Sequence, residues 1–87
     1  MIRAEEAVDP NDIAKMIEQA IEGASAEVRT DGQGHYEAFV VSELFAGKRS
    51  VQRHRMVYGA LGSYVGNEIH ALAVRTFTPE EWKSRAS

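Results

Sequence analysis

The central part of the fold is predicted from the sequence Asp31-Gly32-Gln33-Gly34-His35-Tyr36-Glu37-Ala38-Phe39-Val40-Val41-Ser42. Its first four residues predict a tight hairpin turn, because glycine supplies the positive φ that such turns need. Residues 35–42 then predict a strand, with β-branched and aromatic side chains at its centre. The segment 26–30 before the turn is expected to be the other strand of the hairpin, antiparallel to the first.

A third strand is predicted over residues 71–77, and a helix-containing crossover of roughly 28 residues separates it from the second strand. Connections of this length and kind usually link parallel strands, with a right-handed crossover. We therefore expect a mixed, three-stranded sheet with helices packed on one face.

Helix signals complete an α+β domain. Asp9-Pro10 is typical of a helix start, and an apolar stripe follows at helical spacing, at Ile13, Met16, Ile17, Ala20 and Ile21. Ser50 is expected to cap a helix over 50–61, followed by a short helical turn over 62–66. Thr78-Pro79 begins a last short helix. The predicted order is α-β-β-α-(α)-β-α, in a single domain over residues 9–85 after a flexible extension over 1–8.

Composition narrows the class of protein. The chain has 87 residues, is 44% apolar and contains no cysteine, so it has no thiolate nucleophile and no thiolate ligand for iron or zinc. No apolar stretch reaches the roughly 18 residues of a membrane helix, and the acidic N-terminus has no secretory signal. We expect a soluble cytoplasmic protein. No Ser–His–Asp arrangement or phosphate-binding glycine motif is present, so an enzyme is not expected.

Two histidines stand at comparable places. His35 opens the second predicted strand, and His70, in Gly66-Asn67-Glu68-Ile69-His70-Ala71-Leu72, precedes the third. Parallel, adjacent strands would bring both imidazoles to one end of the sheet, as a two-histidine half-site for a metal. The simpler alternatives are a structural His70 bonded to a backbone carbonyl and an exposed hairpin His35.

Charge is unevenly distributed in a chain whose net charge is −3. Residues 1–27 hold seven acidic residues against two basic ones, whereas residues 47–55 hold four basic residues and no acid. These four are Lys48, Arg49, Arg53 and Arg55, and His54 lies among them. We expect them to form one exposed basic surface for nucleic acid or an anionic partner, although a solvated helix start would have the same composition.

The chain resembles the BolA family over about residues 12–82. The resemblance rests on these segments: Val40-Val41-Ser42, Phe45-Ala46-Gly47-Lys48-Arg49-Ser50, Arg53-His54-Arg55-Met56-Val57-Tyr58, His70-Ala71-Leu72-Ala73-Val74 and Thr76-Phe77-Thr78-Pro79-Glu80-Glu81-Trp82. It implies a fold similar to a type II KH domain. It also implies a non-enzymatic adaptor that shares a [2Fe–2S] cluster with a monothiol glutaredoxin and its glutathione, for iron sensing, cluster assembly or cluster transfer.

In that family the position that matches His70 supplies one ligand, and the loop between the first two strands supplies another, either Cys or His. Here the loop residue is His35, so the chain resembles the histidine-loop subgroup. No cluster is expected in the isolated chain, which is expected to be a monomer or a weak homodimer.

The resemblance also keeps a second function open. The family has been linked to transcriptional regulation, and Gly47-Lys48-Arg49-Ser50 matches the place of the GxxG loop with which KH domains clamp a nucleic-acid backbone. Ser50 replaces the second glycine of that clamp. DNA binding through the basic residues is therefore the alternative to glutaredoxin binding.

Overall fold

The computed structural model describes residues 8–85. In chain order these form α1 (Pro10–Ala20), β1 (Ser25–Thr30), β2 (His35–Val41), the 3-10 turn η2 (Glu43–Phe45), α2 (Ser50–Leu61), the 3-10 turn η3 (Gly62–Tyr64), β3 (Ala71–Phe77) and α3 (Pro79–Arg85). The predicted order of elements is confirmed, and the 3-10 turn η2 is added between β2 and α2. Residues 1–7 of the expected flexible extension lie outside the described residues. Val8, its last residue, accepts a hydrogen bond from the Tyr36 hydroxyl at 2.7 Å.

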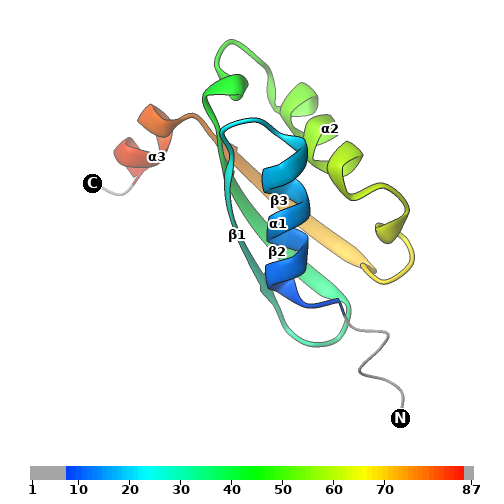
Figure 1. The fold of residues 1–87 in the computed structure, drawn as a ribbon. Helices are drawn as coiled ribbons and strands as arrows, with labels where there is room; N and C mark the ends of the chain where they lie inside the picture. Colours follow the sequence, from blue (N-terminus) through cyan, green and yellow to red (C-terminus); the bar gives the residue numbers. More distant parts are fainter. Residues whose placement is uncertain (1–7, 86–87) are drawn as a thin grey trace.

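The sheet has the order β1-β2-β3 (Figure 1). β1 and β2 pair antiparallel, with Thr30 opposite Tyr36. β2 and β3 pair parallel, with His35 opposite Ala71 at one end and Val41 opposite Phe77 at the other. The predicted mixed sheet and its parallel crossover are therefore confirmed, and the start of β2 lies at the same edge as the start of β3.

The core lies between the sheet and the two longer helices. Alternate β2 side chains are buried, and they meet the apolar stripe of α1 and one side of α2. The core residues are Ile13, Ile17, Ile21, Tyr36, Ala38, Val40, Phe45, Val57, Leu61 and Ile69. Burying one such large aliphatic or aromatic side chain is worth about 1.5–3 kcal/mol, so this layer holds the sheet and helices together.

The expected helix over 50–61 is confirmed as α2, but its capping residue differs from the expectation. Arg49, not Ser50, is the N-cap, and the Arg49 N–H donates to the side-chain oxygen of Gln52 at 3.0 Å. The acceptor three residues into the helix satisfies a backbone donor that the first turn leaves free. Ser50 is therefore already helical and does not cap the helix.

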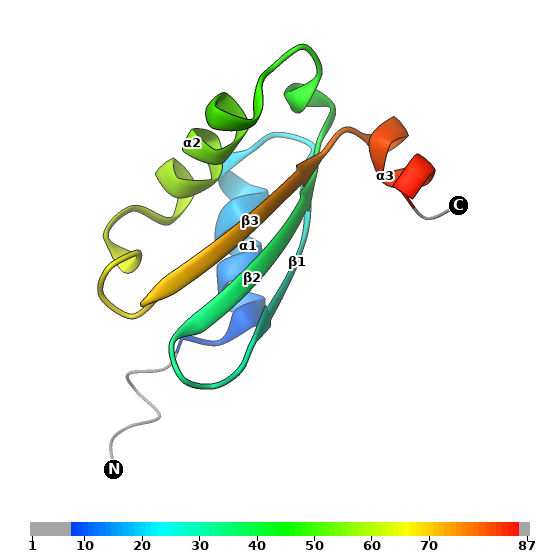
Figure 2. The same ribbon diagram turned by 180° about the vertical axis from the view of Figure 1, so that it is seen from behind.

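The short helix α3 departs from the expectation that the helices share one face. Trp82 of α3 makes edge contacts with Phe77, at a centroid distance of 5.0 Å, and with Phe39, at 6.4 Å. Phe39 alternates with the buried β2 residues, so its side chain lies on the face opposite α1 and α2. Figure 2 shows the sheet from that side, with α3 at its end. No helix within residues 8–85 is long and apolar enough to cross a bilayer.

Candidate functional site

The two predicted ligand residues, His35 and His70, lie at the same end of the sheet, where β2 and β3 begin. The Gly34 carbonyl accepts hydrogen bonds from the N–H groups of His70, at 2.8 Å, and Ala71, at 3.1 Å. His35 follows Gly34 directly and pairs with Ala71. The backbones that carry the two imidazoles are thus joined through Gly34, as a parallel crossover predicts.

His35 is oriented by Asp31 in the preceding turn. Its Nδ1 lies 2.8 Å from a carboxylate oxygen of Asp31, and the His35 side chain is 60% exposed. The other Asp31 oxygen accepts the Gln33 N–H at 2.8 Å. The Gln33 hydrogen bond, and after it the one to His35, hold the pKa of Asp31 below its usual range. An ionised carboxylate only accepts hydrogen bonds, so Nδ1 is the donor, and in the neutral imidazole Nε2 then has a lone pair for a metal.

His70 is exposed and lies against Gly34. A β-carbon at position 34 would overlap Cδ2 of the His70 ring and lie 2.9 Å from its Cγ. Gly34 also has a φ of +88°, a conformation that favours glycine. A larger residue at position 34 would therefore have to displace the imidazole.

The loop before β3 fixes the backbone position of His70 at the start of the strand. Ile69 is fully buried in the core, its N–H donates to Tyr64 at 2.9 Å, and its carbonyl accepts from Gly66 at 2.8 Å. Burial of its side chain and hydrogen bonds at both its N–H and its carbonyl fix the position of Ile69 relative to β3. His70, the next residue, is consequently held at the surface.

The chain offers a pair of imidazoles at this edge. Within residues 8–85, no group of three or more His, Cys, Asp and Glu side chains is arranged to hold a metal ion. Imidazole nitrogen is a suitable ligand for iron, and a [2Fe–2S] centre can take two histidines on one iron with thiolates on the other. The donor set fits half of such a centre.

The prediction of an exposed basic surface is wrong for Arg53, one of its four residues. Lys48, Arg49 and Arg55 are exposed around the start of α2, but the Arg53 side chain is only 12% exposed. Its guanidinium makes two hydrogen bonds to the Glu81 carboxylate, at 2.9 and 3.3 Å. Arg53 is thus neutralised locally, and three basic residues remain available to an anionic partner.

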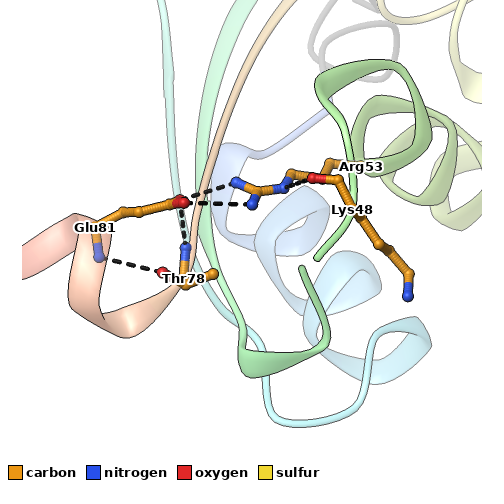
Figure 3. Close-up of polar contacts among 4 residues, drawn as sticks. All are labelled: Lys48, Arg53, Thr78 and Glu81. Atoms are coloured by element: carbon orange, nitrogen blue, oxygen red, sulfur yellow. Dashed lines mark hydrogen bonds and ion pairs between the residues drawn. The ribbon is translucent and has the colours of Figure 1, made fainter. Parts of the chain in front are cut away.

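Arg53 of α2 contacts three other segments, which are the loop at Lys48, η2 and α3 (Figure 3). Its Nε donates to the Lys48 carbonyl at 2.9 Å, and its guanidinium lies 5.8 Å from the centre of the Phe45 ring. Glu81 in turn accepts the Thr78 N–H at 2.9 Å and donates its own N–H to the Thr78 hydroxyl at 3.2 Å. Arg53 chiefly, and the Thr78 hydrogen bond second, lower the pKa of Glu81. This connection between α2 and α3 was missed by sequence reasoning.

The chain is similar to proteins of one known family. A family profile described as BolA-like protein matches residues 11–81. The DNA-binding transcriptional regulator BolA of Vibrio cholerae is 49% identical over 51 residues, which cover 59% of this chain and 48% of that protein. Human BolA-like protein 1 is 33% identical over 84 residues, covering 97% of this chain and 58% of that protein. The chain thus spans about half the length of these curated relatives.

The fold is also found among solved structures. A BolA homologue from Coxiella burnetii superimposes with a TM-score of 0.78 and 39% sequence identity, covering 87% of this chain and 97% of that one. The profile match includes β2, α2 and β3, and therefore both histidines and the basic loop. On sequence and on structure alike, this chain belongs to the BolA family.

Proposed function

We propose that the protein is a non-enzymatic adaptor that shares a [2Fe–2S] cluster with a monothiol glutaredoxin and its glutathione. The observation that carries the proposal is the junction at Gly34, which brings His35 and His70 to one exposed edge. Asp31 holds His35 with Nε2 free, and Ile69 holds His70 at the surface. The glutaredoxin and glutathione supply the thiolates that this chain lacks.

Histidine ligands would give the shared cluster two distinctive properties. Neutral imidazoles in place of thiolates reduce its negative charge and raise its reduction potential. Protons compete with iron for imidazole nitrogen, so the complex should also be lost at acid pH. Both properties suit a role in iron sensing, cluster assembly or cluster transfer.

A titration of cluster-loaded glutaredoxin with this protein tests the proposal. We expect the visible absorption and circular dichroism spectra to change to those of a mixed-ligand cluster. His70→Ala and His35→Ala should each prevent the full change, whereas the matched control His54→Ala, a half-buried histidine of α2, should behave as wild type. Unchanged spectra for His70→Ala with the complex intact would remove the ligand assignment.

DNA binding is the second candidate function. It is supported by the exposed Lys48, Arg49 and Arg55 and by the name of the Vibrio cholerae relative. Contacts of such side chains with phosphates would make the affinity fall steeply with salt. The absence of a second glycine at Ser50 and the chain's net charge of −3 make us rank it below the adaptor role.

A further inference from the structure

The sheet has a second face, opposite α1 and α2, which we call the open face. On β2 and β3 its side chains alternate with those that enter the core. They are His35, Glu37, Phe39, Val41, Ala71, Ala73, Arg75 and Phe77, with Glu27 and Arg29 of β1 beside them. Within residues 8–85, α3 is the helix that contacts this face, and it does so through Trp82 and Arg85. The helix lies at one end of the sheet (Figure 2).

Three aromatic rings gather at that end. Phe39 and Phe77 come from adjacent parallel strands, and Trp82 meets each of them edge-on, at interplanar angles of 68° and 72°. All three are partly exposed and none belongs to the buried core. In each edge-on contact the rim of one ring meets the face of its neighbour, and the partial exposure of all three side chains leaves some of their surface open to a ligand.

Arginines surround the aromatic rings. The Arg85 guanidinium lies 4.2 Å from the Trp82 centroid and 5.5 Å from that of Phe77, and Arg29 lies 5.2 Å from the Phe39 ring. Arg75 pairs with Glu37 across the strands at 3.2 Å, with side chains 62% and 38% exposed. Arg29 pairs likewise with Glu27 at 3.2 Å, with side chains 65% and 60% exposed. Such exposed ion pairs contribute little to stability, so Arg29 and Arg75 can exchange their carboxylate partners for phosphate oxygens.

We propose that the open face binds single-stranded nucleic acid, with bases stacked on the aromatic rings and phosphates held by Arg29, Arg75 and Arg85. Rings on a sheet surface bordered by arginines are the recurring means of holding unpaired bases. The guanidiniums now over the rings are themselves flat cations that stack on bases. The site differs from the Lys48, Arg49 and Arg55 surface at the start of α2.

A single strand fits this face better than a duplex does. Bases in a duplex are already stacked on one another, so their faces are closed to protein rings. A purely electrostatic site for duplex phosphates would not need Phe39, Phe77 and Trp82 together. The arginine border likewise fits a polyanion better than an uncharged apolar partner.

Fluorescence provides the test, because Trp82 is the single tryptophan of the chain. The probe is an oligouridylate of about ten nucleotides, close to the site size of a small single-strand-binding domain. We expect Trp82 emission to be quenched on binding, and the affinity to decrease with salt. An equally long duplex and inorganic polyphosphate should not quench Trp82.

Phe39→Leu keeps an apolar side chain but removes the stacking surface, so it should weaken binding by about tenfold or more. Tyr58→Leu, which removes an exposed aromatic ring from α2, is the matched control and should bind as wild type. Unaltered far-ultraviolet circular dichroism verifies that each variant is folded.

Four results would overturn the proposal: no binding at low salt, binding without quenching, equal affinity for polyphosphate, or equal affinity of Phe39→Leu and wild type. If replacing Lys48, Arg49 and Arg55 abolished oligouridylate binding while Phe39→Leu did not, the start of α2 would be the binding site instead. None of these measurements contains glutaredoxin or iron, so they test the open face independently of the adaptor role.

Discussion

Gly34 accepts a hydrogen bond from the His70 N–H at 2.8 Å, and the His70 ring occupies the space that a β-carbon at position 34 would need. The same glycine sits at φ +88°. One residue therefore closes the hairpin, anchors the entry of β3 and makes room for an imidazole. The hydrogen bond and the ring contact with His70, added to the positive φ, distinguish Gly34 from Gly32, the other glycine of the turn.

Gly34→Ala should destabilise the protein more than Gly32→Ala. Both positions have positive φ, +88° and +83°, so each alanine should cost roughly 1–2 kcal/mol in backbone strain. Only position 34 adds a clash, because nothing lies within 4 Å of a β-carbon at position 32. Urea unfolding of the two variants measures the difference.

The clash can be assigned to His70 with a double-mutant cycle. Adding His70→Ala to Gly34→Ala should recover stability, whereas adding it to Gly32→Ala should not. Equal free energies of unfolding for the two single variants, with no recovery in the double variant, would contradict the contact between Gly34 and His70.

Asp31→Asn should weaken the proposed cluster site while leaving the fold intact. The amide keeps an oxygen for the Gln33 N–H but presents an NH₂ group to His35, which places the imidazole proton on Nε2. Loss of such a supporting contact usually costs about 10–100-fold in metal affinity. Competition with an iron chelator gives the affinity, and Glu27→Gln, which also removes one exposed carboxylate, is the control.

Arg53→Ala should lower the melting temperature by roughly 5 °C, because it removes the connection between α2 and α3. Arg55→Ala removes an exposed arginine from the same helix and should change the melting temperature little. Comparable melting temperatures for the two variants would show that the Arg53–Glu81 contact contributes no stability.

The Arg53–Glu81 pair should also make stability depend on acid pH. The pKa of Glu81 is lowered from its ordinary 4.5, so the folded state binds this proton less readily than the unfolded chain. The stabilisation is complete above pH 4.5 and is lost as the pH falls through the lower folded pKa. Thermal melts of wild type and Glu81→Gln should therefore converge below that pKa, whereas a constant gap would contradict the assignment.

Replacing Lys48, Arg49 and Arg55 by alanine should reduce any duplex DNA affinity uniformly across sequences, because backbone contacts do not read bases. The slope of log affinity against log salt should become shallower by about 0.9 for each lost phosphate contact. Arg53 is left unchanged because its replacement would destabilise the fold, and a loss of affinity could then result from unfolding. A sequence-selective loss would show instead that these residues read base edges.

Local signals in the sequence were sufficient for most of the fold. The Asp31–Gly34 turn, the stripe on α1 and the β-branched strands each depend on nearby residues, and the crossover length led to the parallel pairing of β2 with β3. The common edge of His35 and His70 followed from that pairing. That these residues bind a cluster stays a prediction.

Contacts between segments far apart in the sequence could not be predicted from such local signals. Arg53 and Glu81 are 28 positions apart, and neither has a local pattern that marks a partner, so Arg53 was assigned to the exposed basic surface. The helices were expected on one face of the sheet, but the short segment between β3 and α3 lets Trp82 of α3 reach Phe39 on the other face. Such contacts depend on the path of the chain in three dimensions, which local sequence patterns do not specify.

The origin of the ligands to the proposed cluster is the most direct test of the adaptor role. Pulsed electron paramagnetic resonance of the reduced complex, prepared with this chain labelled with ¹⁵N-histidine and with unlabelled glutaredoxin, detects histidine nitrogens bound to iron. We predict strong ¹⁵N couplings from two histidines, one of which disappears in His70→Ala and the other in His35→Ala. A complex with an intact cluster and no ¹⁵N coupling would contradict the account.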